Sequence, residues 1–204
     1  MQYDTAGGYD AICVTDHYHR ECFDYAEMDL TTPGSKTQAF LQGYHRLKKV
    51  SEKYNIRVYA GAELRFDESD NDYLLYGFHD ALLADPDRVM REGLAAFAPQ
   101  YRADGALLVQ AHPFRKKCTP APAEYLDGIE VLNLNPRHDS HNDLALAYAR
   151  EHHLIMTAGS DCHRPGEQGT TGILSDTLPE DSFGLADLLR SGNYPIIRPE
   201  CTED

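Results

Sequence analysis

Histidines and carboxylates recur at the ends of short apolar runs in this sequence of 204 residues. The residues concerned are Asp16, His17, Glu63, His79, His112, Asp161 and His163. Imidazole and carboxylate groups are the ligands that zinc, iron and manganese take in proteins. A single histidine after a strand is more often a hydrogen-bonded loop residue. Several such groups at one place are costly unless a cation compensates them, so the set predicts a metal centre.

The apolar runs are typical of buried strands that alternate with helices. The predicted strands cover residues 10–15, 57–62, 73–78, 106–111, 129–132, 154–158 and 194–197. The predicted helices cover residues 36–54, 88–102, 142–152 and 182–191, with Ser35 and Thr37 as candidate caps and Gly192 as a stop signal. This alternation indicates an α/β fold with parallel strands. Because parallel strands share one carboxyl-terminal rim, the candidate ligands should meet there.

Size and charge restrict the class of protein. A chain of this length is expected to form one domain over residues 1–204. The net charge of −14 disfavours nucleic acid and anionic membranes as partners. The sequence shows no apolar run long enough to span a bilayer and no secretory leader pattern. Five cysteines without a C-x-x-C pair fit reduced thiols, so we expect a cytoplasmic protein.

Six segments, taken in order, resemble successive motifs of the PHP family, which is named for polymerase and histidinol phosphatase. They are GYDAICVTDH (8–17), GAEL (61–64), YGFH (76–79), AHPFR (111–115), IEVLNLN (129–135) and AGSDCH (158–163). Each motif is weak alone, but their order and spacing match over nearly the whole chain. The resemblance implies a distorted (β/α)7 barrel with a trinuclear metal site at its carboxyl-terminal rim. It also implies hydrolysis of a phosphoester, which many members of the family catalyse.

The resemblance assigns roles to individual residues. The implied metal ligands are His17, Glu63, His79, His112, Asp161 and His163. Glu63, His79 and His112 would form one nearly complete site, with Glu63 bridging two ions. Asp161 would belong to a second site, and His17 with His163 to a third. Asp16 would orient His17 rather than bind metal.

Arg115, in the AHPFR segment, is the candidate phosphate-binding residue and completes the predicted catalytic set with Glu63 and Asp161. An ion pair between Arg115 and one of the acidic residues is an equally good interpretation. Arg164 is a comparable candidate for holding phosphate, and Arg65 is a weaker one.

The sequence departs from the family pattern at its start. Members begin with a strand that ends in H-x-H and supplies ligands to two ions, and this sequence has no counterpart. Met1–Gly8 has the pattern of the end of a first helix, so the opening strand is either truncated or lost. A barrel without that strand would expose two sheet edges, which predicts association into a homo-oligomer.

Three further segments receive structural interpretations. The acidic run Asp67, Glu68, Asp70 and Asp72 is expected to be a solvated turn. His19 lies outside the implied ligand pattern, and Cys162 should face away from the metals because alternate residues of an extended segment point apart.

The predicted function is hydrolysis of a small phosphomonoester, similar to that of histidinol phosphatase, by two or three Zn, Mn or Fe ions. The alternative is a catalytically impaired module that binds a metal or a phosphorylated ligand. Hydrolysis of a C–N bond is disfavoured because no lysine follows a strand where a carboxylated bridging ligand would be expected.

Overall fold

The computed structural model describes residues 8–25, 35–167, 169 and 171–198. Its strands are β1 (Ala11–Val14), β2 (His17–Tyr18), β3 (Arg57–Arg65), β4 (Asp72–Tyr76), β5 (Leu107–Gln110), β6 (Gly128–Asn133), β7 (Ile155–Gly159), β8 (Gly172–Ile173) and β9 (Ile196–Ile197). Its α-helices are α1 (Arg20–Tyr25), α2 (Ser35–Phe40), α3 (Gln42–Ser51), α4 (Pro86–Asp104), α5 (Asn142–Glu151) and α6 (Ser182–Ser191). Short 3-10 helices are η2 (Glu52–Tyr54), η3 (Asp80–Leu83) and η4 (Ala123–Tyr125).

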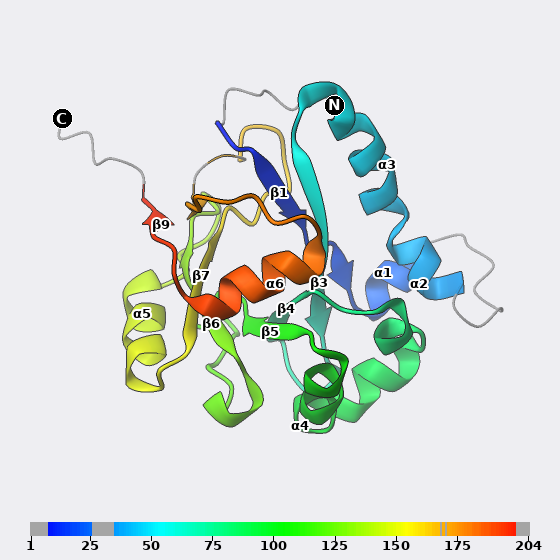
Figure 1. Cartoon of the computed structure of the whole chain (residues 1–204). Helices are drawn as coiled ribbons and strands as arrows, with labels where there is room; N and C mark the ends of the chain where they lie inside the picture. Colours follow the sequence, from blue (N-terminus) through cyan, green and yellow to red (C-terminus); the bar gives the residue numbers. More distant parts are fainter. Residues whose placement is uncertain (1–7, 26–34, 168, 170, 199–204) are drawn as a thin grey trace.

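The main sheet is mixed and strongly curled into a half-barrel (Figure 1). Its strand order is β1-β3-β4-β5-β6-β7, and the short β2 also pairs with β3. The pairs β1/β3, β2/β3, β5/β6 and β6/β7 are parallel. β4 is antiparallel to both of its neighbours, β3 and β5. The prediction of an α/β fold is therefore confirmed, and the sheet is curled as a barrel wall would be.

The prediction of parallel strands throughout is wrong at β4. Only residues 66–71 connect β3 to β4, and a parallel crossover needs a dozen or more residues. The chain therefore turns back on itself and pairs Arg65 with Asp72. The last predicted strand, 194–197, is also not part of the main sheet, because β9 pairs antiparallel with β8.

The predicted helices at 88–102, 142–152 and 182–191 correspond to α4, α5 and α6. Asp181 caps α6 by accepting a hydrogen bond from the Gly184 amide, and Gly192 ends it at φ 61°. The predicted helix at 36–54 is divided into α2, α3 and η2. Thr37 is not a cap: it lies buried inside α2 and its hydroxyl donates to the Leu83 carbonyl over 2.8 Å.

The two faces of the sheet pack against different helices. Alternate strand residues such as Ala62, Leu75 and Leu108 belong to a core that includes residues of α4 and α5. Residues on the opposite face, such as Leu74 and Val109, pack against α6, and we call this the α6 face. Figure 1 shows α6 crossing the sheet while α3, α4 and α5 lie around the outside. The same period of two places Glu63, Asp72 and Glu130 on the α6 face.

β1 and β7 form the two ends of the strand order among the described residues. The hydroxyl of Tyr9, just before β1, donates to the Thr171 carbonyl, just before β8, over 2.8 Å. The segment before β1 is therefore in contact with the segment before β8, and β8 contacts β7. The prediction of a helix end at Met1–Gly8 falls, apart from Gly8, outside the described residues.

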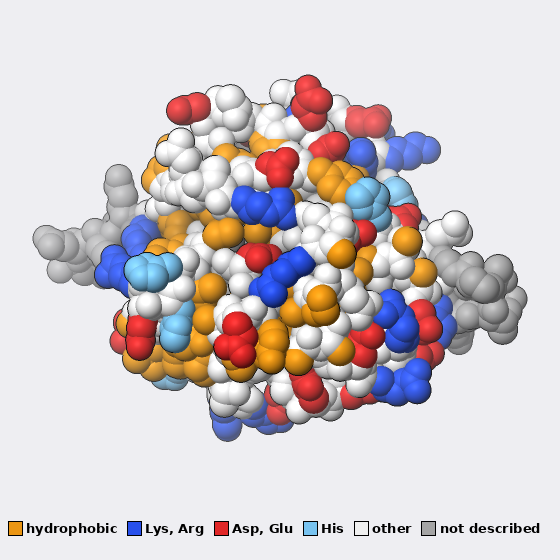
Figure 2. All heavy atoms as spheres, turned by 60° about the horizontal axis from the view of Figure 1, so that its bottom comes forward, with side chains coloured by type: hydrophobic (Ala, Val, Ile, Leu, Met, Phe, Trp, Pro, Cys, Tyr) orange, Lys and Arg blue, Asp and Glu red, His pale blue; other side chains and the backbone are white. Residues whose placement is uncertain are grey.

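Acidic and basic side chains are interspersed on the face that Figure 2 brings forward, so the acidic excess is not gathered there. Within the described ranges, no helix is both long and apolar enough to cross a membrane.

Gly77 tests the packing of α6 on the sheet. It has φ +61°, and a Cβ added there would lie 2.7 Å from the Ala186 Cβ and 3.1 Å from the Ser182 carbonyl oxygen. Gly192 has the same φ of +61° but nothing within 4 Å of such a Cβ. We expect Gly192→Ala to cost about 1 kcal/mol through its left-handed backbone. Gly77→Ala should cost about 1–3 kcal/mol more, because it also overpacks the contact with α6.

Urea unfolding of both variants measures these free energies. Equal losses in the two variants would contradict the close contact between Gly77 and α6.

Candidate metal centre

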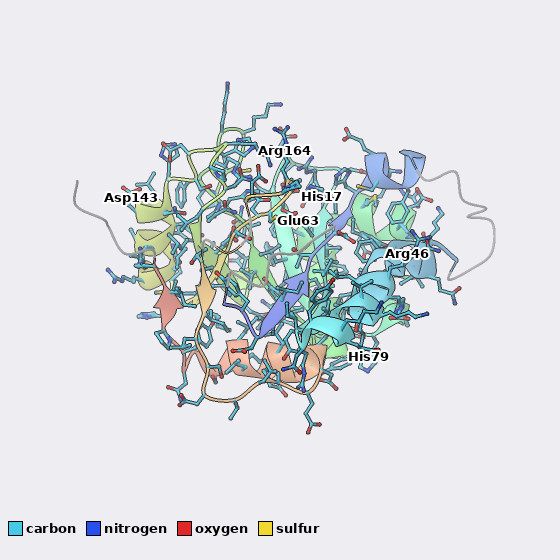
Figure 3. All side chains as sticks on the ribbon, turned by 90° about the horizontal axis from the view of Figure 1, so that it is seen from above. His17, Arg46, Glu63, His79, Asp143 and Arg164 are labelled. Carbon is cyan, nitrogen blue, oxygen red and sulfur yellow. The ribbon has the colours of Figure 1, made fainter. Side chains whose placement is uncertain are left out.

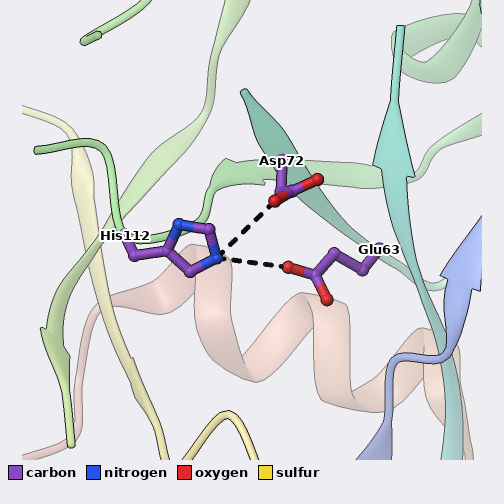
Figure 4. Close-up of side chains that lie close together, drawn as sticks. All are labelled: Glu63, Asp72 and His112. Atoms are coloured by element: carbon purple, nitrogen blue, oxygen red, sulfur yellow. Dashed lines mark ion pairs between the residues drawn. The ribbon is translucent and has the colours of Figure 1, made fainter. Parts of the chain in front are cut away.

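Glu63, Asp72 and His112 form a buried cluster of potential ligands. Each offers one ligand atom, and these atoms all lie within 4.8 Å of one another. His112 Nε2 lies 3.3 Å from Glu63 Oε1 and 3.8 Å from Asp72 Oδ2 (Figure 4). Glu63 comes from β3, Asp72 begins β4, and His112 follows β5. The antiparallel course of β4 is what brings Asp72 to this end of the sheet.

The cluster continues through His17 to Asp161. His17 is the register partner of Glu63, and its Nδ1 lies 3.2 Å from Glu63 Oε2. His17 Nε2 lies 3.2 Å from His163 Nε2, and His163 Nδ1 lies 3.2 Å from Asp161 Oδ1. Close contacts therefore run without a break from Asp72 to Asp161. The structure brings together five of the predicted ligands, and their role in binding metal stays a prediction.

His79 does not join this cluster. It follows β4, which runs opposite to β3 and β5, so it lies at the other end of the sheet. Its Nδ1 is 3.2 Å from an oxygen of Asp104, the last residue of α4, and its ring packs on Phe183. In Figure 3, Glu63 and His17 lie together while His79 lies well apart. The predicted site of Glu63, His79 and His112 is therefore wrong in its second member, and Asp72 occupies that place.

Asp72 was expected in a solvated turn, yet it is buried. Arg65 holds both of its oxygens, with Nε and Nη2 each donating over 2.8 Å. Asp72 alternates with Leu74 and Tyr76 along β4, and this pattern could have placed it on the same face of the sheet as those residues. Other acidic residues of that run bind locally: Asp67 pairs with Arg20, and Glu68 accepts from the Leu94 amide where α4 is interrupted.

Arg115 forms the ion pair that was the alternative to phosphate binding. Its Nη2 lies 2.7 Å from Asp161 Oδ2 and also donates to Asn133 and Ser140. Its Nε is buried and has no hydrogen-bond partner among the described residues. The guanidinium is thus bound on one side by protein groups.

Asp16, His19 and Cys162 lie beside the cluster. One oxygen of the Asp16 carboxylate lies against α3, where a Cβ on Gly43 would lie 2.9 Å from Asp16 Oδ2. The backbone carbonyl of Asp16 accepts from the Glu63 amide, so Asp16 positions Glu63 through the main chain, and its predicted role in orienting His17 stays a prediction. His19 Nε2 lies 3.5 Å from Cys22 Sγ. Cys162 is exposed and contacts the Arg164 carbonyl.

The residues present fit a divalent ion. His17 Nδ1 is buried and faces a Glu63 oxygen, yet it makes no hydrogen bond of acceptable geometry. Two nitrogens bound to one tetrahedral zinc at 2.0–2.1 Å would lie about 3.3 Å apart, close to the separation of His17 and His163. Two buried carboxylates beside the buried imidazole of His112 also suit a cation. Glu63, Asp72 and His112 would hold one ion. His163 faces His17 through Nε2 and Asp161 through Nδ1, so a second ion held by these three residues stays a prediction.

Two buried groups in this region have displaced pKa values. Burial works against the charged form of His112, but its contacts with Cys118 and Glu63 and the charge of Glu130 prevail and raise its pKa to about 10. Burial raises the pKa of Glu130 to about 7, although the charge of His112 and a hydrogen bond from Asn133 oppose the shift. Without metal, His112 therefore carries a proton at neutral pH.

Comparison with known proteins agrees with this architecture. Residues 139–191 match the model of the PHP-associated family. A two-domain protein from Bacteroides vulgatus, which contains a predicted PHP-like metal-dependent phosphoesterase, superposes with a TM-score of 0.65 and 16% identity. The match covers 94% of this chain but only 56% of that protein, less than two thirds of its length. PsfC from Pseudomonas syringae superposes with a TM-score of 0.61 and 19% identity, over 94% of this chain and 78% of PsfC.

A search of curated proteins finds no match to the chain. The family match and the structural neighbours nevertheless define the class: this is an α/β protein with a PHP-like fold and a PHP-associated segment. The resemblance to PHP proteins that the sequence motifs indicated is therefore confirmed.

The raised pKa of His112 predicts proton release on metal binding. A metal ligand must be a neutral imidazole, so an ion that binds His112 must displace its proton. Below pH 10, the affinity for Zn²⁺ should therefore rise by about tenfold per pH unit for each proton displaced. Calorimetry at pH 7.5 in buffers of different ionisation enthalpy should show about one proton released per ion.

His45 of α3, which lies outside the cluster, supplies the control for this titration. His45→Gln should release the same number of protons as the unchanged protein. An affinity that does not change with pH would contradict coordination by His112.

Proposed function

We propose that this protein is a metal-dependent phosphoesterase that hydrolyses a small phosphomonoester. The observation that carries the proposal is the buried cluster of Glu63, Asp72 and His112, continued by His17 toward Asp161. A PHP-like fold and a structural neighbour described as containing a PHP-like phosphoesterase support it. The net charge of −14 favours a small substrate over an extended polyanion.

Bound divalent ions would supply Lewis acidity for the phosphoryl oxygens and a water of lowered pKa. Glu63 has one oxygen facing His112 and the other facing His17, so it is placed to contact two ions. Asp72 and Asp161 are each held by an arginine, which keeps one carboxylate at either end of the cluster in a fixed orientation. In this proposal, these residues bind the ions and keep them in place. Zn, Mn or Fe suits their mixed nitrogen and oxygen donors.

Arg164 is better placed than Arg115 to hold the phosphate. Arg115 already binds Asp161, Asn133 and Ser140. Arg164 directly follows His163 and lies near His17 and Glu63 in Figure 3. Its side chain is exposed and has no recorded partner among the described residues. A guanidinium in that position can donate two parallel hydrogen bonds to a phosphate.

One observation favours a second function, a non-catalytic module that binds a metal or a phosphorylated ligand. Arg65 neutralises Asp72 and Arg115 neutralises Asp161, so two of the carboxylates are satisfied without ions. In that case an ion would be bound through the carboxylate of Glu63 alone, and this binding would be too weak to support catalytic turnover. Hydrolysis measured on metal-loaded protein separates the two functions.

The test measures metal content and phosphate release together. Protein loaded with Zn²⁺ or Mn²⁺ should retain at least one ion and release phosphate from p-nitrophenyl phosphate and from a panel of phosphomonoesters. Glu63→Gln and His112→Ala should each lower kcat/KM by about 100-fold or more, because they remove ligands of the ions. His79→Ala should leave metal content and activity unchanged, since His79 lies at the other end of the sheet.

Retention of metal without phosphate release would favour the binding module. Phosphate release that survives in both Glu63→Gln and His112→Ala would show that the cluster is not the active site. Loss of metal in His79→Ala would contradict the structural assignment of Asp72 in place of His79.

A further inference from the structure

Glu130 is a buried carboxylate beside the metal centre that the proposed chemistry does not use. It lies on β6 and is 3% exposed. One of its oxygens, Oε2, accepts hydrogen bonds from the His112 amide over 3.0 Å and from Asn133 Nδ2 over 2.9 Å. The other oxygen occupies space left by Gly159, where an added Cβ would lie 2.7 Å from Glu130 Oε1. The His112 amide is therefore hydrogen-bonded to this carboxylate, and Gly159 on the neighbouring strand β7 leaves room for it.

Asn133, at the end of β6, forms hydrogen bonds through both the nitrogen and the oxygen of its side-chain amide. Its Nδ2 donates to Glu130 and, over 3.4 Å, to Asp161 Oδ2. Its Oδ1 accepts from Arg115 over 2.9 Å and from the Asn135 amide over 3.1 Å. Buried amides with every donor and acceptor engaged have a single orientation. Asn133 therefore connects Glu130 with the ion pair of Arg115 and Asp161.

The two residues that this network reaches have unusual backbone angles. His112 has φ 29° and Asp161 has φ 49°, which few residues other than glycine adopt. Such conformations persist where surrounding contacts hold them. The His112 amide is held by Glu130, and the Asp161 carbonyl is held by Asn135 Nδ2 over 2.7 Å. The backbones of His112 and Asp161 are therefore each held by a residue of the 130–135 segment.

We propose that Glu130 and Asn133 form a positioning pair that fixes His112 relative to Asp161, so that both ends of the candidate ligand cluster depend on one buried network. The inference rests on the metal centre of the proposed function, and not on which phosphoester is hydrolysed. The pair acts through His112 on one side and through Asp161 on the other.

Three substitutions separate positioning from simple packing. Glu130→Leu removes the acceptor, whereas Glu130→Gln retains an oxygen that can accept both hydrogen bonds. Asn133→Asp keeps the size of the side chain but turns an oxygen toward the carboxylates of Glu130 and Asp161. Thr157→Val is the matched control, because Thr157 is the buried register partner of Glu130 on β7 and its hydroxyl has no recorded hydrogen bond.

Titration with Co²⁺, followed by its visible absorption, measures metal affinity and geometry together. Glu130→Leu and Asn133→Asp should weaken Co²⁺ binding by about 10–100-fold. Glu130→Gln should stay within about threefold of the unchanged protein, and Thr157→Val should match it. The free energy of unfolding of metal-free Glu130→Leu should change little, because removing a buried carboxylate offsets the two lost hydrogen bonds. Weaker binding without lost stability is a result that packing alone would not produce.

Hydrogen exchange on metal-free protein provides a readout that does not depend on the proposed function. In Glu130→Leu, exchange should accelerate at the His112 amide and also at residues 160–164, which lie beyond the direct contact with Gly159 and which Glu130 reaches through Asn133. Acceleration at both places would support the positioning pair even if no variant hydrolysed a phosphoester or bound an ion. Acceleration at His112 alone, or Co²⁺ affinity equal in Glu130→Leu and the unchanged protein, would overturn it.

Discussion

Buried charge at one end of the α6 face is the constraint on which the rest of this structure depends. Glu63, Asp72 and Glu130 are all buried there. Carboxylates in such surroundings must be paired, protonated or bound to a cation. Each of the three carboxylates is stabilised in a different way. Arg65 pairs with Asp72, Glu130 has a raised pKa and accepts two hydrogen bonds, and Glu63 lies beside the imidazoles of His17 and His112. Glu63, with no guanidinium among its recorded partners, is the carboxylate best placed to receive an ion.

The α6 face has an apolar part that packs against α6 and a polar part that carries the candidate metal ligands. Leu185, Ala186 and Leu189 of α6 cover its apolar part, where Leu107 and Val109 of β5 lie. The polar part begins where the strands of the parallel pairs end, and the antiparallel β4 joins it through its first residue instead of its last. Apolar burial thus holds the strands in register, and that register sets the spacing between Glu63, Asp72 and His112. A site built in this way depends on strand pairing more than on any single loop.

Much of this arrangement follows from local sequence pattern. Short apolar runs and helical periodicity located the main strands and α4, α5 and α6. The positions of His17, Glu63, His112, Asp161 and His163 at strand ends indicated that they would meet, and contacts between neighbouring members now join them. The orientation of Arg115 was open, since both phosphate and carboxylate suit a guanidinium, and only the position of Asp161 in space resolved it.

The amino-acid sequence by itself determined the α/β class, the PHP-like motifs and most of the residues that meet at the candidate site, because periodicity and residue type act locally along the chain. Tertiary structure decided which side chains meet at this end of the sheet: Asp72, at the start of the antiparallel β4, lies with Glu63 and His112, and His79 does not. It also decided that Glu130 and Asn133 lie behind His112 and Asp161. Strand direction and burial depend on which segments become neighbours, and a pattern within one segment carries no information about its partner.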